Sequence, residues 1–127
     1  MRDLIISSLI VLLLIGCWCV FDNYSHSNTK VLSNIIIEDI IPLTEKEEWN
    51  DAAELYNRVE DKWNNYKKTA LSFLENDQIS EIDLCIARAE KYIEAKDVSN
   101  SAGELCSISK QLQLLDSREK ITLSNIL

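Results

Sequence analysis

Residues 49–73 read WNDAAELYNRVEDKWNNYKKTALSF, and this stretch decides the fold. Its apolar and aromatic side chains recur at alternating spacings of three and four residues, which is the spacing of one face of an α-helix. The pattern predicts one long helix with a face that other helices must cover. The residues predicted to form this buried face are Trp49, Ala52, Tyr56, Val59, Trp63, Tyr66, Ala70 and Phe73.

Two further amphipathic segments follow and supply the expected partner helices. The first comes after Asn76 and Asp77, and the second begins after Asp97, whose carboxylate can cap a helix N-terminus. Because both connections are short, consecutive helices are predicted to run antiparallel. Ser117 is expected to cap a last short helix. The predicted core residues of the two segments are Ile79, Ile82, Ile86, Ala89 and Ile93, then Ala102, Leu105, Leu112 and Leu115.

The segment before residue 49 contains a proline and a capping pattern. Pro42 is expected to end the apolar stretch at residues 31–41, because proline disfavours helical geometry in the residue before it. Thr44 and Glu47 have the spacing of a capping box, in which each side chain bonds a backbone amide at the start of a helix. The long helix is therefore expected to begin at Thr44.

The composition favours helices throughout. The chain has 127 residues but only two glycines and one proline, whereas a β-sandwich or barrel needs many tight turns. Without the apolar N-terminus, about 105 residues remain, which is enough for one small domain with one core. The predicted fold class is all-α: an N-terminal transmembrane helix followed by a small antiparallel bundle of three to four helices.

The N-terminus carries a long apolar stretch. Residues 4–21 are interrupted only by Ser7, Ser8 and Gly16, and a helix of this length rises ~27 Å against a hydrocarbon core of ~30 Å. A buried core helix is a poor alternative, because the segment is apolar around its whole circumference. We predict a transmembrane anchor or uncleaved signal at residues 1–21, a juxtamembrane helix or stalk at 22–43, and the bundle at 44–127.

The charges that flank the apolar stretch predict its orientation. The α-amine and Arg2 precede it, and Lys30 is the one basic residue that soon follows it. Because basic flanks tend to stay in the cytoplasm, the N-terminus is predicted to be cytoplasmic and the C-terminal domain extracytoplasmic. The expected location is the cell membrane, with a single pass.

A lipoprotein anchor is the alternative. Residues 14–17, LIGC, resemble a bacterial lipobox, whose cysteine is lipidated and becomes the mature N-terminus. However, residues 18–21 continue the apolar stretch where a lipoprotein normally turns polar, and Asp3 weakens the basic region. These features favour the uncleaved anchor, and Cys17 remains the candidate lipidation site.

Few residues suggest chemistry. The net charge of −8 lies almost wholly after the apolar stretch, so the domain would repel nucleic acids. His26 is the single histidine, which leaves Ser/His or Cys/His relays and zinc sites without the usual partners. We predict no catalytic, cofactor-binding or metal-binding residues and no enzyme activity. Cys85 and Cys106 are expected on adjacent helices, with buried free thiols favoured over a disulfide.

Two functions remain open at this stage. The first is a non-enzymatic interaction module at the membrane that docks an integral membrane or envelope protein, because the chain has one strong core seam without a reactive constellation. The second is a small-ligand or cation sensor that uses the aromatic and acidic faces. An aromatic stripe at this spacing is more often core than ligand groove, and no segment has the oxygen pattern of a calcium loop. The oligomeric state is not predicted.

The order of these features resembles a bacterial family catalogued as domain of unknown function 4363. The resemblance implies short, membrane-anchored helical proteins of Gram-positive, often spore-forming bacteria, without an assigned activity or catalytic residues. It covers nearly the whole chain. The residues that carry it are Glu48-Trp49-Asn50-Asp51-Ala52, Trp63, Ile79-Ser80-Glu81-Ile82-Asp83, Ala87-Arg88, Tyr92-Ile93, Asp97, Leu112 and the closing Thr122-Leu123-Ser124-Asn125-Ile126-Leu127.

Overall fold

The fold consists of helices joined by tight turns. The computed structural model describes residues 1–74 and 76–126, with side chains described as far as Asp116. The predicted all-α class is confirmed for these residues. The elements are α1 (Arg2–Asn34), the π-helix η1 (Ile35–Ile40), α2 (Ile41–Glu45), α3 (Trp49–Ala70), α4 (Asn76–Glu94) and α5 (Val98–Ile126).

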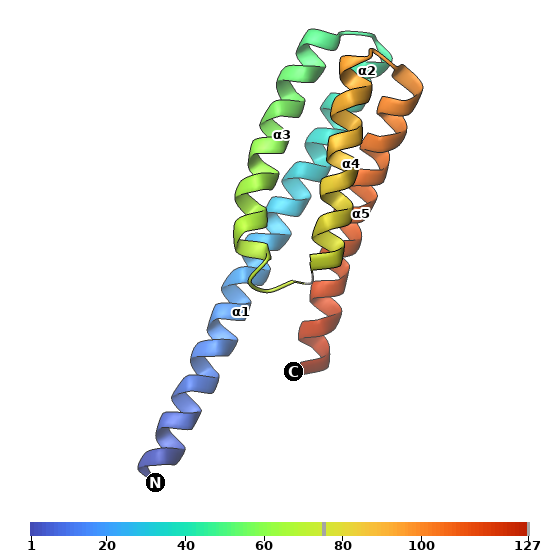
Figure 1. Ribbon diagram of the computed structural model, residues 1–127. Coiled ribbons are helices and arrows are strands. Elements are labelled where there is room, and N and C mark those ends of the chain that lie inside the picture. Colours follow the sequence, from blue (N-terminus) through green and yellow to red (C-terminus); the bar gives the residue numbers. More distant parts are fainter. Residues whose placement is uncertain (75, 127) are drawn as a thin grey trace.

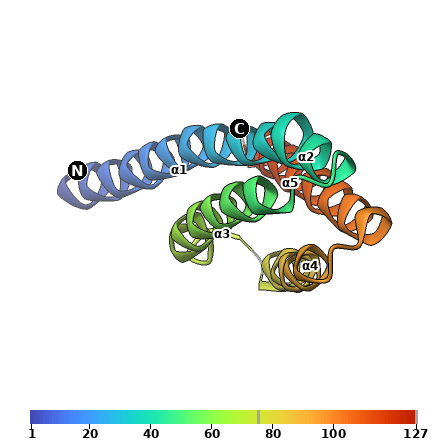
Figure 2. The ribbon, with the colours of Figure 1, turned by 90° about the horizontal axis from the view of Figure 1, so that it is seen from above.

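The long helices form an antiparallel bundle (Figure 1). α1, α3, α4 and α5 alternate in direction, and each packs against the next, with α5 closing the ring against α1. Seen from above, α1 and α5 lie on one side and α3 and α4 on the other (Figure 2). The first part of α1 projects beyond the other helices, and the end of α5 lies at the same end of the bundle.

The interior of the bundle is built from the predicted helix faces. On α3 the structure buries Ala52, Tyr56, Val59, Trp63 and Tyr66, each with 2% or less of its surface exposed. A helix with this periodicity buries its apolar stripe against neighbouring helices, which for α3 include α1 and α4. Most of the predicted residues on α4 and α5 are buried too: Ile79, Ile82, Ile86, Ala89, Ile93, Leu105, Leu112 and Leu115. Ala102, also predicted as core, is only partly buried.

The ends of the predicted α3 face differ from the expectation. Phe73 lies after the last residue of α3 and is 37% exposed, so it is not a core residue of the helix. Trp49 begins α3 and is only partly buried against the core. The apolar spacing in the sequence continues to Phe73, but the helix stops at Ala70. Phe73 therefore faces α1 from the turn that follows the helix.

Pro42 does not end the preceding segment, contrary to the prediction. α1, η1 and α2 follow one another without a break, and Pro42 lies in the first turn of α2. The π-helix explains this, because its wider turn shifts the hydrogen-bond register: the amide of Ile41 donates to the carbonyl of Ile36, five residues back. The wider turn accommodates a proline that would clash in a regular α-helix.

The predicted capping box is also wrong. Thr44 belongs to α2 and its hydroxyl donates to the carbonyl of Ile41 at 2.8 Å, while α3 begins at Trp49 without a side-chain cap. The chain turns between the two helices through Glu47, whose φ is 58°. The amide of Glu48 closes this turn by donating to the carbonyl of Leu43 at 2.9 Å. Side-chain capping is replaced by a backbone turn.

The turn between α4 and α5 also contains a residue with positive φ and is closed by a backbone hydrogen bond. Lys96 has a φ of 56° and the amide of Asp97 donates to the carbonyl of Tyr92 at 3.0 Å. Asp97 then caps α5 as predicted, because its carboxylate accepts from the amide of Asn100 at 3.1 Å. This bond lowers the pKa of Asp97. The short last helix expected after Ser117 does not form separately, since α5 continues to Ile126.

The segment expected to be a juxtamembrane helix or stalk is helical and packs in the bundle. Phe21, Ser25, Thr29, Leu32 and Ser33 lie on the inner face of α1 and are all buried. Their spacing of three and four residues is helical, but three of them are polar, which gives the segment the composition of an exposed linker. The helical domain therefore begins near residue 21 and not at residue 44.

Candidate functional site

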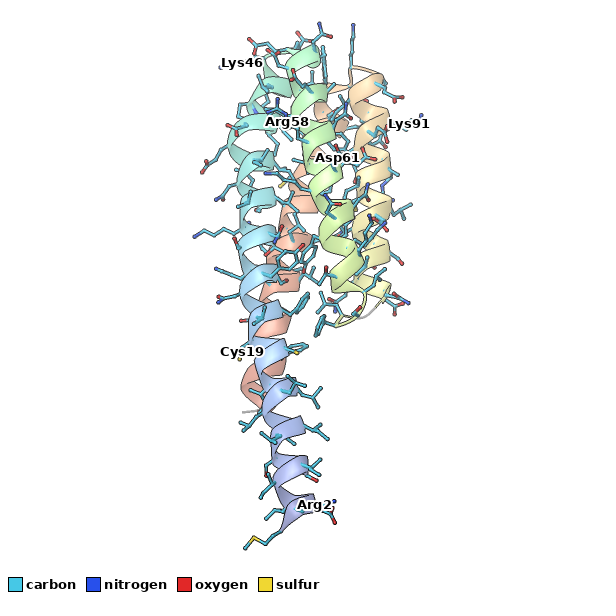
Figure 3. The ribbon with its side chains drawn as sticks, turned by 90° about the vertical axis from the view of Figure 1, so that its left-hand side faces the viewer. Arg2, Cys19, Lys46, Arg58, Asp61 and Lys91 are labelled. Atoms are coloured by element: carbon cyan, nitrogen blue, oxygen red, sulfur yellow. The ribbon has the colours of Figure 1, made fainter. Side chains whose placement is uncertain are left out.

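The projecting part of α1 is the most unusual surface of the molecule. Its large apolar side chains stand away from the bundle, from Leu4 at 68% exposed to Ile15 at 37% exposed. Figure 3 shows Arg2 at the far tip of this segment and Cys19 where it meets the bundle. The continuous helix Arg2–Glu45 is long and apolar enough in its first part to cross a membrane, by length and composition.

An aromatic cluster marks the junction between this segment and the bundle. Phe21 of α1 stacks on Phe73 with ring centroids 4.3 Å apart, and Trp18 meets the edge of Phe73 at 6.0 Å. Tyr66 of α3 joins the cluster, 5.9 Å from Tyr24 and 6.5 Å from Phe21. Such offset and edge-to-face pairs add stability beyond the area they bury, so α1 is fixed firmly to the end of α3.

A groove opens beside this cluster. It has a volume of about 560 Å³ and lies between α1 and the end of α3. Its lining is almost entirely apolar, which is unusual for a surface that faces water. The lining residues are Leu12, Leu13, Gly16, Cys17, Val20, Phe21, Tyr24, Thr69 and Phe73.

Polar side chains hold α1 against α5. Ser33 and Ser109, both buried, share a hydrogen bond of 2.7 Å, and Nδ1 of His26 lies 2.9 Å from Oδ2 of Asp116. His26, Ser33 and Asp116 border a small polar cleft of about 160 Å³. Ser25 bonds the hydroxyl of Tyr66 across to α3. The bonds satisfy buried polar groups that would otherwise destabilise the interface.

A second set of polar contacts joins α3 and α4. The indole N–H of Trp63 donates to Asp83 at 2.6 Å, and Lys67 pairs with the same carboxylate at 3.1 Å. The hydroxyl of Tyr56 donates to the backbone carbonyl of Ile86. Burial raises the pKa of Tyr56, so this phenol stays protonated and acts as a donor. Tyr56 and Trp63 are thus core residues with satisfied polar groups.

The acidic side chains between α3 and α4 repel one another. Burial is the largest cause that raises the pKa of Glu60, followed by the nearby carboxylates of Glu90 and Asp61. No group of three or more metal-ligating side chains gathers anywhere in the described part of the chain.

The four cysteines have free thiols, but of the pair expected to be buried only Cys85 is. Cys85 is buried and accepts a hydrogen bond from Arg88 at 3.3 Å, whereas Cys106 is exposed. The two do not form the alternative disulfide. Arg88 also bridges to α5 by donating to Glu104 at 3.0 Å, which raises the pKa of the guanidinium. Cys17, the candidate lipidation site, is exposed and lines the apolar groove.

The groove was not expected from the sequence. The sequence pattern places Phe73 on the buried face of a helix. Its exposure follows from the end of α3 at Ala70, which the pattern does not indicate. The signal that was present is the uncharged sequence of residues 71–74, LSFL, between two helices, because a turn exposed to water is normally polar.

The family of the chain is shown by comparison with known families. The family model described as Domain of unknown function (DUF4363) matches residues 20–126. The chain belongs to this family. No curated protein and no solved structure matches this chain.

The limits of the DUF4363 match agree with the structure. The match begins at residue 20, next to Phe21, which is the first buried residue of α1. The DUF4363 domain therefore includes the part of α1 that packs in the bundle, and the exposed apolar segment precedes it.

Proposed function

We propose that this DUF4363 protein is a single-pass membrane protein whose helical domain lies outside the cytoplasm and binds an integral membrane or envelope protein without catalysing a reaction. The observation that carries the proposal is the continuity of α1. The same helix carries the exposed apolar segment and the buried residues from Phe21 onward. A domain built directly onto a membrane helix is held at a fixed height above the bilayer, where it can meet proteins in the same membrane.

The orientation rests on the flanking charges. Arg2 and the α-amine precede the apolar segment, and the following turns of α1 contain Asp22, His26 and Lys30. The excess of basic groups before the segment favours a cytoplasmic N-terminus. The acidic charge of the domain does not oppose export, because carboxylates contribute little to this preference.

The non-enzymatic role rests on how the polar groups are used. His26 contacts Asp116, Arg88 bridges to Glu104, and Trp63 binds Asp83. Each of these contacts joins two helices, so the side chains best suited to chemistry stabilise the bundle. The outer face of α3 exposes charged residues, among them Arg58 and Asp61 (Figure 3), and offers a polar surface for a protein partner.

Orientation and anchoring can be tested in spheroplasts. A protease added outside spheroplasts should remove the helical domain, while a tag before Arg2 should remain protected until the membrane is opened. Digestion from the cytoplasmic side alone would contradict the orientation. Release of the protein by carbonate washing would contradict the anchor.

Binding of a partner needs a position-specific test. A photo-cross-linking amino acid at Asp61 is expected to join the chain to one membrane or envelope protein in the native membrane. The same amino acid at Asn100, in the first turn of α5, is the matched exposed control. Cross-linking that is equal at both positions, or absent at both, would contradict a specific docking surface on α3.

The lipoprotein alternative makes a separate prediction. The bundle begins at Phe21, so cleavage before Cys17 would leave the domain complete and attach it through a lipidated cysteine. The intact mass of the protein extracted from membranes distinguishes the two anchors. Retention of residues 1–16 supports the transmembrane helix, and a mass that begins at a lipidated Cys17 supports the lipoprotein.

A ligand-sensing role is the second candidate, with a changed location. The aromatic face of α3 is buried, whereas the polar cleft between α1 and α5 is open and bordered by His26 and Asp116. An imidazole and a carboxylate together suit a cation or a small polar ligand. A thermal-shift screen of residues 20–127 tests this role, with His26→Gln as the control that should abolish any shift.

A further inference from the structure

We propose that the turn between α3 and α4, residues 71–74, lies in the membrane surface and that a lipid acyl chain occupies the groove between this turn and α1. The inference rests on the proposed membrane anchor and goes beyond it, because it gives the helical domain a second contact with the bilayer. The interacting partner is the lipid itself.

The length of the projecting segment is the first argument. Large apolar side chains are exposed from Leu4 to Ile15 and again at Val20, and the first of these stretches rises ~18 Å as a helix. The hydrocarbon core of a bilayer is ~30 Å thick. The apolar span must therefore continue through Trp18 toward Phe21, where the aromatic cluster already belongs to the bundle.

The depth of the turn follows from the aromatic contacts. Phe73 stacks on Phe21 at 4.3 Å and meets Trp18 at 6.0 Å, so the turn lies beside the same level of α1. Figure 1 shows this turn at the end of the bundle from which the apolar part of α1 projects. If α1 crosses the bilayer, the turn reaches the membrane surface.

The composition of the turn suits that position. Leu71 and Phe73 are 45% and 37% exposed, and the sequence LSFL carries no charge. Lys67 and Lys68 stand in the last turn of α3, one helical turn back. The apolar side chains at the tip of the turn can insert among lipid acyl chains. The lysines behind them are then at the level of the phosphate headgroups.

The groove provides the place for an acyl chain. It is open along α1, has a volume of about 560 Å³ and presents apolar side chains from Leu12 to Phe73. Water molecules are poorly stabilised in this groove, because few polar groups there can form hydrogen bonds with them. A groove that continues the lipid-facing surface of a transmembrane helix is filled by acyl chains, which remove the exposed apolar area from water.

The test uses the full chain reconstituted in phosphatidylcholine vesicles that contain a phosphatidylcholine with a photoreactive diazirine in its acyl chain. After illumination, mass spectrometry locates the labelled residues. Labelling of the α3–α4 turn, in addition to residues 4–15, is the expected result. Labelling of residues 4–15 without the turn would overturn the inference and leave the anchor in place, whereas absence of labelling on residues 4–15 would overturn the anchor itself.

A second measurement determines depth without relying on photochemistry. A nitroxide is attached at Leu71→Cys in a full chain in which Cys17, Cys19 and Cys106 are replaced by alanine; Cys85 stays because it is buried. In vesicles, the nitroxide at 71 should be more accessible to oxygen than to a water-soluble nickel complex. The matched control, Lys96→Cys at the opposite end of the bundle, should show the reverse. The same aqueous behaviour at both positions would overturn the inference.

Discussion

Glu60 lies partly buried between α3 and α4, where burial, Glu90 and Asp61 raise its pKa. A raised pKa means that the folded state favours the protonated acid, so its stabilising contribution is present below the ordinary pKa and lost as pH rises through the raised value. Glu60→Gln should therefore increase Tm at pH 7, with the gain vanishing below about pH 4. Circular dichroism melts at both pH values measure this, and the exposed Glu81→Gln is the control. A gain that is independent of pH would contradict the assignment.

Lys96 adopts a left-handed conformation, with a φ of 56°, to end α4. This region is costly for residues with a Cβ and free of that cost for glycine. Lys96→Gly should stabilise the domain by ~0.5–1 kcal/mol, since relief of strain is partly offset by a more flexible unfolded chain. Lys91→Gly inside α4 should instead destabilise it by ~1 kcal/mol. Urea unfolding distinguishes the two, and a loss of stability in both would show that Lys96 is unstrained.

Trp63 is the largest side chain of the core, 1% exposed, and binds Asp83 through its indole N–H. Trp63→Ala should destabilise the domain by ~3–5 kcal/mol, because it leaves a large cavity. Trp49→Ala should cost less, since Trp49 is only partly buried at the start of α3. Denaturant unfolding compares the two variants. Equal losses would mean that the two tryptophans are packed alike.

Among the helices, α1 departs most from the sequence prediction, because its second half is a wall of the bundle. Phe21, Ser25 and Thr29 pack in the core, so a fragment of residues 20–127 should fold, while a fragment of residues 44–127 should not, because it lacks one wall of the bundle. Far-ultraviolet circular dichroism and the cooperativity of thermal unfolding measure the difference. A cooperative transition in the shorter fragment would show that α3, α4 and α5 are sufficient.

The middle of each element and the Asp97 cap of α5 could be predicted from the sequence, whereas the ends of α2 and α3 could not. Tyr56, Val59 and Ile82 repeat with helical spacing, and burial follows from that repeat whatever the neighbours are. Pro42 and Thr44 carry strong local signals, but the π-helix before the proline changes the backbone register and removes the expected break. The sequence preferences of proline and of capping residues apply to regular α-helices, so they fail next to the wider turn of a π-helix.

The candidate site was harder to predict for a related reason. Ser25, Thr29 and Ser33 look like linker residues because they are polar, and only their hydrogen bonds to other helices and within α1 explain their burial. The groove depends on where α3 stops relative to Phe21, which is a tertiary property. A sequence pattern contains no information about that alignment.

For the whole molecule, the uninterrupted path from α1 to α2 sets the height of the domain. The helix from Trp18 to Glu45 spans 28 residues, or ~42 Å, so a fluorophore at Lys46→Cys should lie ~40 Å above the membrane surface. Energy transfer to labelled lipid headgroups measures this height. A bundle lying flat on the bilayer would bring the fluorophore within ~20 Å and would contradict an upright domain.

Because this helix is unbroken, the domain tilts together with the apolar segment. Because no flexible joint separates the apolar segment from the bundle, any change in the inclination of that segment moves the distant α2 end sideways. Membrane helices incline by ~20° on average, which for an arm of ~42 Å displaces its tip by ~14 Å. Bilayer thickness would then govern which neighbouring proteins the tip can reach.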